Sequence, residues 1–208
     1  MSTATLESNT STKGITQHSI PLSTAKSIAS LIVFASKDKV TPALQVVRVV
    51  FDHGKITATA TDRYAVGQGT YNYDHRDSGT IYLDAAAAKF ISSYKVARFQ
   101  DPMVAFDVLD NILKIKTSDT STSGLMFEGN YPAVETLFEN HKPAEAAEVH
   151  HFRVELLAKL NKVVDVDGSK IENWAFEFGT KTQPNRPVPV IATASTFRAL
   201  IQPNLATR

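Results

Sequence analysis

Apolar and polar residues follow one arrangement that occurs three times along this chain. Each time, a short strand leads into an amphipathic helix, and further strands with alternating apolar residues follow. The helices are expected to begin near residues 24, 85 and 154, about 60 to 70 residues apart. Such spacing is typical of an internal structural repeat.

The first unit contains the segment HSIPLSTAKSIASLIVFAS, in which Ser23 or Thr24 is the predicted N-cap of the helix. Strands are predicted in LQVVRVVFD, KITATATD and AVGQGTYNY, and His53-Gly54 should form the turn between the first two. Apolar residues at helical spacing predict one buried helix face, made of Ala25, Ile28, Ala29 and Ile32.

The second and third units repeat this order. Asp84 is the predicted cap of the second helix, and the hairpin that follows should turn at Asp110-Asn111. In the third unit, strands are predicted in IENWAFEFG, PVPVIATA and FRALIQPNL, and Trp174, Phe176 and Phe178 are expected to face the core. The expected apolar helix faces are Ala87, Phe90, Ile91 and Tyr94 in the second unit, and Leu156, Leu157, Leu160 and Val164 in the third.

The pattern predicts an α+β fold of antiparallel sheets with helices on one face, built from three repeated β-α-β half-domains. Each predicted helix also carries lysine away from its apolar stripe. One such lysine is usually a solvated residue, but three equivalent faces with lysine also fit a surface that meets the phosphates of a nucleic acid. The lysines concerned are Lys26, Lys89, Lys159 and Lys162.

Composition narrows the class of protein. The 208 residues are 43% hydrophobic, which is enough for one large domain or two small ones with a core. With 22 basic and 21 acidic side chains the net charge is +1, which argues against binding to nucleic acid through overall charge. No apolar run approaches the roughly 18 residues of a membrane span, so we expect no membrane association. Residues 1–16 are rich in Ser and Thr and are predicted to form a disordered tail.

Residues typical of catalysis do not gather in any motif. The chain lacks cysteine, which excludes disulfides and thiolate chemistry. His150 and His151 are neighbours on an expected strand and would point to opposite faces, so they cannot share a metal. The segment DVDGSK lacks the closing glutamate of a calcium loop and is predicted to be a hairpin turn. We therefore expect no catalytic residues, no metal and no cofactor, and a protein that is not an enzyme.

Three segments resemble the bacterial DNA polymerase III β subunit, the sliding clamp, in a short or phage-like version. LQVVRVVFDHGKITATATDRYAV is similar to the clamp stretch in which two strands end in a Thr-Asp-x-aromatic turn. MFEGNYPAVETLF is similar to the clamp segment G-x-[FY]-P, and ALIQPNL is similar to its terminal strand and tail. The matching residues are Ala60, Thr61, Asp62, Arg63, Tyr64, Val66, Gly129, Tyr131, Pro132, Leu137, Ile201, Pro203 and Leu205.

The resemblance implies the DNA-clamp fold, in which paired half-domains form a ring whose helices line a hole around duplex DNA. Residues 17–140 would be one complete clamp-like domain of two half-domains, and residues 148–208 a third clamp-like half-domain. Some residues depart from the family pattern. Ala133 stands where the family has Asp, Ala65 where it usually has Arg, and Glu135 and Thr136 where it has basic residues. Clamps of this family also have six half-domains in a chain.

In the family, the same three segments form a hydrophobic pocket for short linear motifs of polymerases and repair proteins. The resemblance implies a partner-peptide pocket here, and it answers why the strand ending at Thr61 is interrupted by Asp62 and Arg63: the turn would be the rim of a binding site. The simpler alternative is an ordinary polar turn with Tyr64 in the core. The implied pocket residues are Thr61, Arg63, Tyr64, Val66, Pro132, Leu137, Ile201 and Pro203.

Two functions remain open at this point. The first is a DNA sliding clamp that encircles duplex DNA and tethers a replicative polymerase as a processivity factor. The second is a clamp-like binding module without a ring, which docks on a polymerase or another clamp and modulates replication. The expected partners are double-stranded DNA, proteins with short clamp-binding motifs and a clamp loader. We expect a cytoplasmic, nucleoid-associated protein, in the host cytoplasm if it is phage-encoded.

The odd number of half-domains expected in the chain predicts that the chain forms an oligomer. Two half-domains complete each other, so a third one would leave strand edges and an apolar helix stripe uncovered. The simplest closure is a two-fold pairing of third half-domains from two chains, which makes a homo-oligomer the expected state.

Overall fold

The computed structural model describes residues 16–74, 77–97, 100–141, 152–179 and 188–203. The expected tail, residues 1–16, lies outside the described residues apart from Thr16, with which the first strand begins. The first parts of the expected third half-domain, including His150 and His151, and its end with Leu205 also lie outside them.

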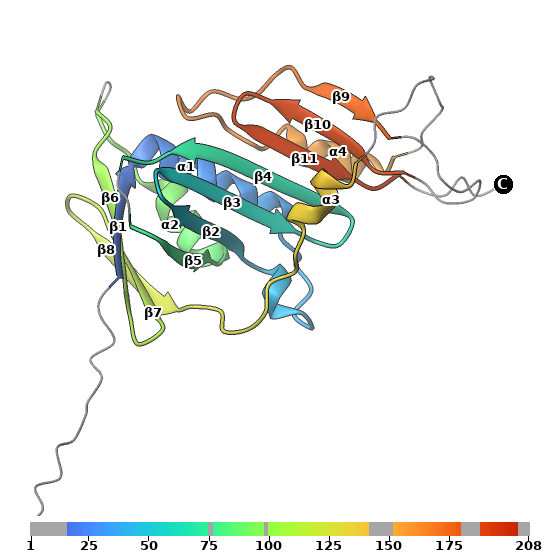
Figure 1. The fold of residues 1–208 in the computed structure, drawn as a ribbon. Coiled ribbons are helices and arrows are strands. Elements are labelled where there is room, and N and C mark those ends of the chain that lie inside the picture. The colour runs from blue at the N-terminus through green and yellow to red at the C-terminus, as the bar shows by residue number, and fades with distance from the viewer. Residues whose placement is uncertain (1–15, 75–76, 98–99, 142–151, 180–187, 204–208) are drawn as a thin grey trace, which may run out of the picture.

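Two antiparallel sheets carry the fold (Figure 1). The four-stranded sheet has the order β1-β6-β7-β8, and the seven-stranded sheet has the order β5-β2-β3-β4-β11-β10-β9. The strands are β1 (Thr16–Pro21), β2 (Val47–Asp52), β3 (Lys55–Thr61), β4 (Ala65–Asn72), β5 (Gly79–Leu83), β6 (Met103–Leu109), β7 (Ile112–Lys116), β8 (Ser121–Leu125), β9 (Ala175–Phe178), β10 (Val190–Ala194) and β11 (Phe197–Ile201).

The helices are short, and the first, second and fourth of them lie where the sequence predicted helices. They are α1 (Leu22–Ser30), α2 (Ala85–Ser93), α3 (Glu135–Glu139) and α4 (Val154–Leu160), with 3-10 turns η1 (Leu31–Phe34) and η2 (Pro42–Leu44). Helices α1 and α2 pack against each other between the two sheets. Helix α3 was not expected from the sequence.

The first two repeats exchange their first strands. Strand β1 precedes α1 but pairs with β6 of the second repeat, and β5 precedes α2 but pairs with β2 of the first. The side chains between the sheets form one core, in which Phe34, Phe51 and Phe106 are completely buried. Antiparallel sheets with helices on one face, in repeated β-α-β units, therefore confirm the expected fold class.

Turns and caps show how far local patterns determine this fold. The carboxylate of Asp84 accepts a hydrogen bond of 2.7 Å from Ala87 N, as expected for an N-cap. Asp110 and Asn111 have φ of 46° and 62° at the predicted hairpin turn. The predicted cap of the first helix is wrong: α1 follows Pro21 without a side-chain cap, and Ser23 instead donates from N and Oγ to the carboxylate of Asp101.

Candidate functional site

Pairing of β4 with β11 brings the predicted pocket segments together. The register runs from Ile201 opposite Ala65 to Phe197 opposite Gly69, so the end of β11 lies beside the turn that precedes β4. Beyond the strand, Gln202 N donates to Tyr64 O at 3.0 Å. The third repeat is therefore joined to the first by one continuous sheet, and the expected site lies at the junction.

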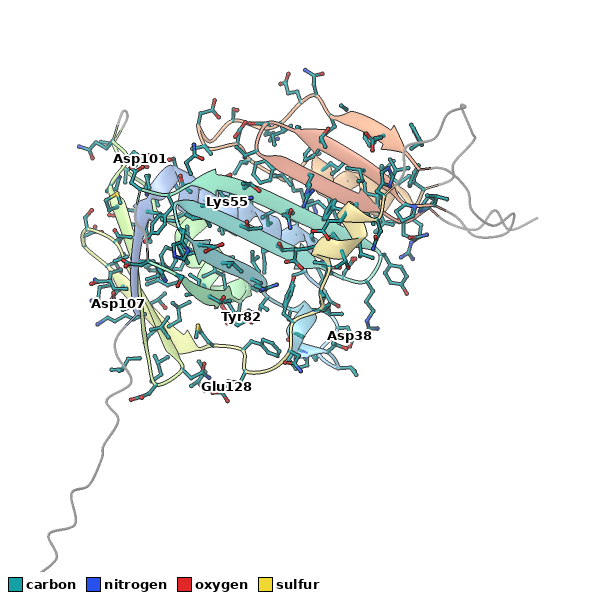
Figure 2. All side chains as sticks on the ribbon, in the orientation of Figure 1. Asp38, Lys55, Tyr82, Asp101, Asp107 and Glu128 are labelled. Atoms are coloured by element: carbon teal, nitrogen blue, oxygen red, sulfur yellow. The ribbon has the colours of Figure 1, made fainter. Side chains whose placement is uncertain are left out.

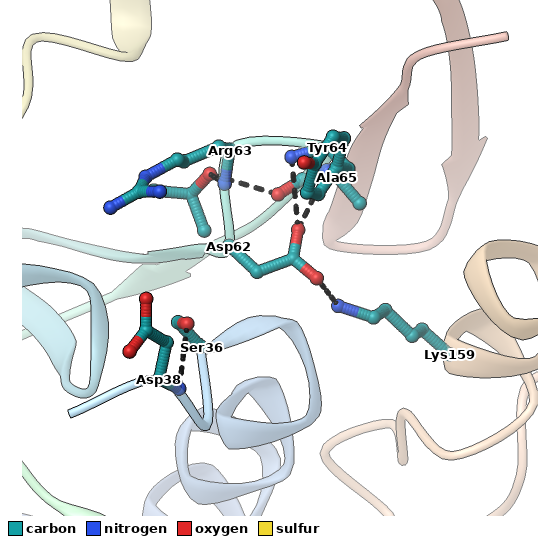
Figure 3. Close-up of polar contacts among 8 residues, drawn as sticks. Ser36, Asp38, Asp62, Arg63, Tyr64, Ala65 and Lys159 are labelled. Atoms are coloured by element: carbon teal, nitrogen blue, oxygen red, sulfur yellow. Dashed lines mark hydrogen bonds and ion pairs between the residues drawn. The ribbon is translucent and has the colours of Figure 1, made fainter. Parts of the chain in front are cut away.

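The turn between β3 and β4 is held by its own side chains. Asp62 Oδ1 accepts from Tyr64 N at 3.1 Å and from Ala65 N at 2.9 Å (Figure 3). Thr61 Oγ1 donates to Ala65 O at 2.9 Å and accepts from Arg63 N at 3.2 Å. Arg63 has φ of 80°, a left-handed conformation that is uncommon for a residue other than glycine.

Asp62 also connects this turn to α4. Its second carboxylate oxygen forms an ion pair with Lys159 Nζ, as Figure 3 shows, and both side chains are largely buried. The same ammonium lies 5.7 Å from the ring centre of Phe34 in η1. Asp62 is thus a structural residue that orders the turn and also fastens the third repeat to the first.

The two residues after Asp62 project toward solvent. Tyr64 is 54% exposed, and the guanidinium of Arg153 lies 5.0 Å from its ring centre. Arg63 donates from its guanidinium to Thr41 Oγ1 beside η2. The ordinary alternative, in which Tyr64 is a core residue, is therefore wrong, and an exposed aromatic ring stands at the rim of the β4–β11 junction.

A small apolar cluster covers the junction on the face of the sheet opposite α1. Helix α3 contributes Phe138, and Val134 precedes that helix. The sheet contributes one apolar residue from each of β4, β10 and β11, which are Val66, Ile191 and Leu200, and Tyr131 packs against them. We call these six residues the junction cluster. Tyr131 and Val66 were expected from the sequence motifs, whereas Val134, Phe138, Ile191 and Leu200 were not.

Buried polar groups lie beside the junction cluster. Arg198 on β11 donates from Nε to Gln68 Oε1 at 2.7 Å, and its guanidinium lies 4.1 Å from the ring centre of Phe138. Desolvation lowers the pKa of Arg198, an effect that the nearby Glu139 and Glu135 oppose. Gln68 donates in turn to Thr59 Oγ1 at 3.2 Å. Because these hydrogen bonds link β11 to β4 and β4 to β3, they favour one register of strand pairing at the junction.

Tyr131 fastens the segment before α3 to the sheet. Its hydroxyl donates to Thr59 O at 3.0 Å, and burial raises the pKa of this phenol well above its ordinary value. Nearby, the ion pair of Arg48 with Glu135 at 3.1 Å holds the start of α3. A groove of 640 Å³ lies along this face, lined by the strands β2, β3 and β5 and by residues 129–135. Tyr82 of β5, labelled in Figure 2, is one of its walls.

The predicted pocket residues take different positions around the junction. Arg63, Tyr64 and Leu137 are exposed, and Pro132 is half-buried. Thr61, Val66 and Pro203 are buried beside them. Ile201 is completely buried in the main core, on the helix side of the sheet, whereas Leu200 next to it joins the junction cluster. The structure places these residues near the junction, but Leu200 and not Ile201 faces the junction cluster.

The four lysines of the expected DNA face differ in their surroundings. Lys89 on α2 and Lys162 after α4 are exposed. Lys26 is half-buried and lines a cavity of 730 Å³ that also contains Asp101, Asp165 and Asp167. Lys159 is paired with Asp62, so its charge is already partly neutralised.

The described part of the chain contains no group of three or more His, Asp or Glu side chains placed to hold a metal ion. Within the same residues, no helix is long and apolar enough to cross a membrane.

Comparison with known proteins gives one sequence relative of note. No protein-family profile matches the chain. The β sliding clamp of Micrococcus luteus is 24% identical over 125 residues, which is 59% of this chain. The present chain spans 40% of the length of that relative.

Solved structures resemble nearly the whole chain. The β subunit of DNA polymerase from Streptococcus pyogenes matches with a TM-score of 0.70 at 16% identity, covering 96% of this chain and 68% of that one. The DNA polymerase sliding clamp of Bacillus subtilis matches with a TM-score of 0.69 at 13% identity, covering 97% and 67%. The chain therefore has the sliding-clamp fold, as the sequence motifs predicted.

Proposed function

We propose that this chain is a DNA sliding clamp that encircles duplex DNA and tethers a replicative polymerase as a processivity factor. The observation that carries the proposal is the convergence of three distant segments at the β4–β11 junction, with Tyr64 and Leu137 exposed at its rim. The proposed role is one of binding, so it assigns no chemistry to the chain. Its partners would be double-stranded DNA, a polymerase, other proteins with short clamp-binding motifs and a clamp loader, in the cytoplasm.

The junction suits an extended peptide for physical reasons. Peptides of this kind bind through a few apolar anchors in a groove and through backbone hydrogen bonds. Tyr64 and Leu137 are apolar and 54% and 46% exposed, so a bound peptide would remove them from water. Asp62 and Thr61 hold the turn in one conformation, which lowers the entropy cost of binding.

The peptide site is tested by replacing its exposed anchors. Tyr64→Ala together with Leu137→Ala should reduce affinity for a short clamp-binding peptide at least tenfold, because anchors of this kind contribute about 1–3 kcal/mol each. Isothermal titration calorimetry would measure the affinity. Val40→Ala with Leu125→Ala is a matched control, since these residues are 84% and 80% exposed elsewhere on the molecule. Unchanged affinity in the first variant would exclude the junction as the peptide site.

The DNA face is tested by charge reversal. Lys26, Lys89 and Lys162 replaced together by Glu should weaken duplex binding and flatten its salt dependence, because each lost phosphate contact lowers the slope by about 0.9. Lys159 is left in place because it holds Asp62. Lys39→Glu, Lys55→Glu and Lys114→Glu form a control with the same charge change at exposed positions. Equal binding by both triple variants would show that the helices do not face DNA.

A second function needs no ring around DNA, and the near balance of charge, a net +1, is compatible with it. The chain would then be a clamp-like module without a ring, which docks on a polymerase or on another clamp and modulates replication. Retention on DNA separates the two functions. A ring stays on nicked circular DNA and is lost when the circle is linearised, whereas a docking module dissociates equally from both.

A further inference from the structure

The first two repeats show how this repeat unit is completed. Each donates its first strand to the sheet of the other, through the β1–β6 and β5–β2 pairs, and their helices α1 and α2 pack side by side. Strand β5 thus covers the outer edge of β2, and α2 covers one flank of α1. Two units of the same kind are needed for this exchange.

The third repeat has the same order of helix and strands. Strands β9, β10 and β11 lie next to one another as β2, β3 and β4 do, and β11 meets β4 edge to edge. Strand β9 therefore holds the place that β2 holds in the first repeat. Among the described residues, no strand pairs with the outer edge of β9, and no helix packs along α4 as α2 packs along α1.

The uncovered flank of α4 can be identified from its side chains. Leu156 and Leu160 point into the core, and Lys159 points toward Asp62 and the first repeat. Leu157 lies about 200° around the helix from Lys159, because each residue turns the helix by about 100°. Leu157 therefore lies on the flank away from the first repeat, where it is 37% exposed, and Val154 one turn earlier is 75% exposed.

Strand β9 adds an aromatic residue to this flank. Phe176 is opposite Ala192, which is completely buried in the core, so Phe176 points to the helix side of the sheet. It is nevertheless 45% exposed, and Phe178 is 38% exposed. Phe176 thus faces the expected side but is only partly covered, because β9 is the edge strand of the seven-stranded sheet (Figure 1). Val154, Leu157 and Phe176 form what we call the β9–α4 face.

We propose that the β9–α4 face binds the same face of a second copy of this chain, so that two third repeats complete one domain. The occupant follows from the chain itself, since the first repeat is completed by the second, which is another unit of its kind. A two-fold arrangement is self-complementary and lets each face cover the other. The inference rests on the fold and the repeat, and gives the proposed clamp a specific contact between subunits.

Molecular mass in solution tests this contact. Light scattering on the full chain should give at least twice 22.7 kDa. Leu157→Lys with Phe176→Lys should halve the mass, while circular dichroism stays unchanged because both side chains are partly exposed in the single chain. Val40→Lys with Leu125→Lys is the control. Both residues are exposed, Val40 in the loop before η2 and Leu125 on the edge strand β8. A monomeric chain at high concentration would overturn the proposal, as would an oligomer that the control variant dissociates and the first variant does not.

Cross-linking tests whether the contact is two-fold. The chain has no cysteine, so a single substitution gives one thiol per copy. Under mild oxidation Leu157→Cys should form a disulfide-linked dimer in high yield, because a two-fold contact brings equivalent residues close together. Val40→Cys should stay monomeric on a denaturing gel. Equal yields from the two variants would contradict the proposal.

The proposal and the proposed function can fail separately. Peptide binding depends on the β4–β11 junction, which lies within one chain. The dissociated Leu157→Lys, Phe176→Lys variant should therefore bind a clamp-binding peptide with unchanged affinity. If it binds the peptide but the unmodified chain is also monomeric, the contact between copies is wrong and the peptide site stands.

Discussion

The first two repeats and the third repeat use the same unit in different surroundings. In the first two repeats, which we call the first domain, α1 and α2 cover each other, and each sheet contains four strands from these repeats. In the third repeat, the described residues cover α4 on the flank toward the first repeat and not on the other flank, and its three described strands continue the sheet through β4. Each repeat unit is therefore stabilised by neighbours on its flanks, and the first repeat is one neighbour of the third, through the β4–β11 junction.

Stability should therefore be unequal in the two regions. The first domain buries large side chains between two sheets, such as Phe51 and Phe106. The third repeat contributes Leu156, Leu160, Val163 and Phe197 to the same core, and adds the ion pair of Lys159. Hydrogen exchange followed residue by residue can resolve local opening of this kind. Exchange rates can therefore separate the two regions.

The largest effect is expected for Phe34→Ala. Phe34 is completely buried in η1, and its ring lies so close to Gly67 on β4 that a Cβ there would come within 2.3 Å of it. Removing it should lower the free energy of unfolding by about 3–5 kcal/mol, measured by urea denaturation. Because the ring contacts both β4 and Lys159, both regions should lose exchange protection. Unchanged hydrogen-exchange protection of α4 in this variant would show that Phe34 does not link the third repeat to the first domain.

Two substitutions at Asp62 should loosen the third repeat while leaving the first domain intact. Asp62→Ala removes the two turn bonds and leaves Lys159 without its partner, for an expected loss of about 2–3 kcal/mol. Asp62→Asn keeps an acceptor for the turn and loses only the charge, for about 1 kcal/mol. Exchange protection of α4 is the measurement. Equal effects of both variants would mean that the ion pair alone matters, and faster exchange in α2 would contradict the separation of regions.

Asp84→Ala is the opposite test, because it should weaken only the first domain. The N-cap bond to Ala87 is local, and such caps contribute about 1 kcal/mol. Exchange should increase in α2, while protection in β10 and β11 stays as it was. Asp84→Ser is a suitable control, because serine also caps helices and should restore most of the stability. A loss of protection in β11 would show that the two regions do not open separately.

The smallest effect at neutral pH is expected for Tyr71→Phe. Tyr71 on β4 packs edge-on against Phe197 of β11 with ring centres 6.1 Å apart, and its hydroxyl lies 3.2 Å from Ser27 Oγ. Loss of that hydrogen bond should cost about 1 kcal/mol or less at pH 7.

The same variant should differ from the unmodified chain at alkaline pH. Burial raises the pKa of the Tyr71 phenol above its ordinary value, so the folded chain keeps the proton after the unfolded chain has lost it. The stabilisation is complete below the ordinary value of about 10 and is lost as the pH rises above it. Unfolding free energies measured from pH 8 to 11 should therefore fall less steeply for Tyr71→Phe. Parallel curves would show that Tyr71 does not couple folding to pH.

Local patterns in the sequence determined much of this fold. Helical spacing located α1, α2 and α4, and turn residues located the hairpins at His53-Gly54 and Asp110-Asn111, all of which have positive φ. These features depend on neighbouring residues, so sequence periodicity and turn chemistry suffice. The clamp motifs likewise predicted the fold and the three segments of the junction, because each motif is continuous in the chain.

The tertiary structure decided which of these elements become neighbours. Phe138, Arg198 and Leu200 meet only because β11 pairs with β4, a contact between residues more than 100 positions apart. Lys159 gained Asp62 as a partner through the same docking, and the edge position of β9 left Phe176 exposed. The physical reason is that alternation assigns a side chain to one face of a strand, whereas burial of that face depends on what packs against it.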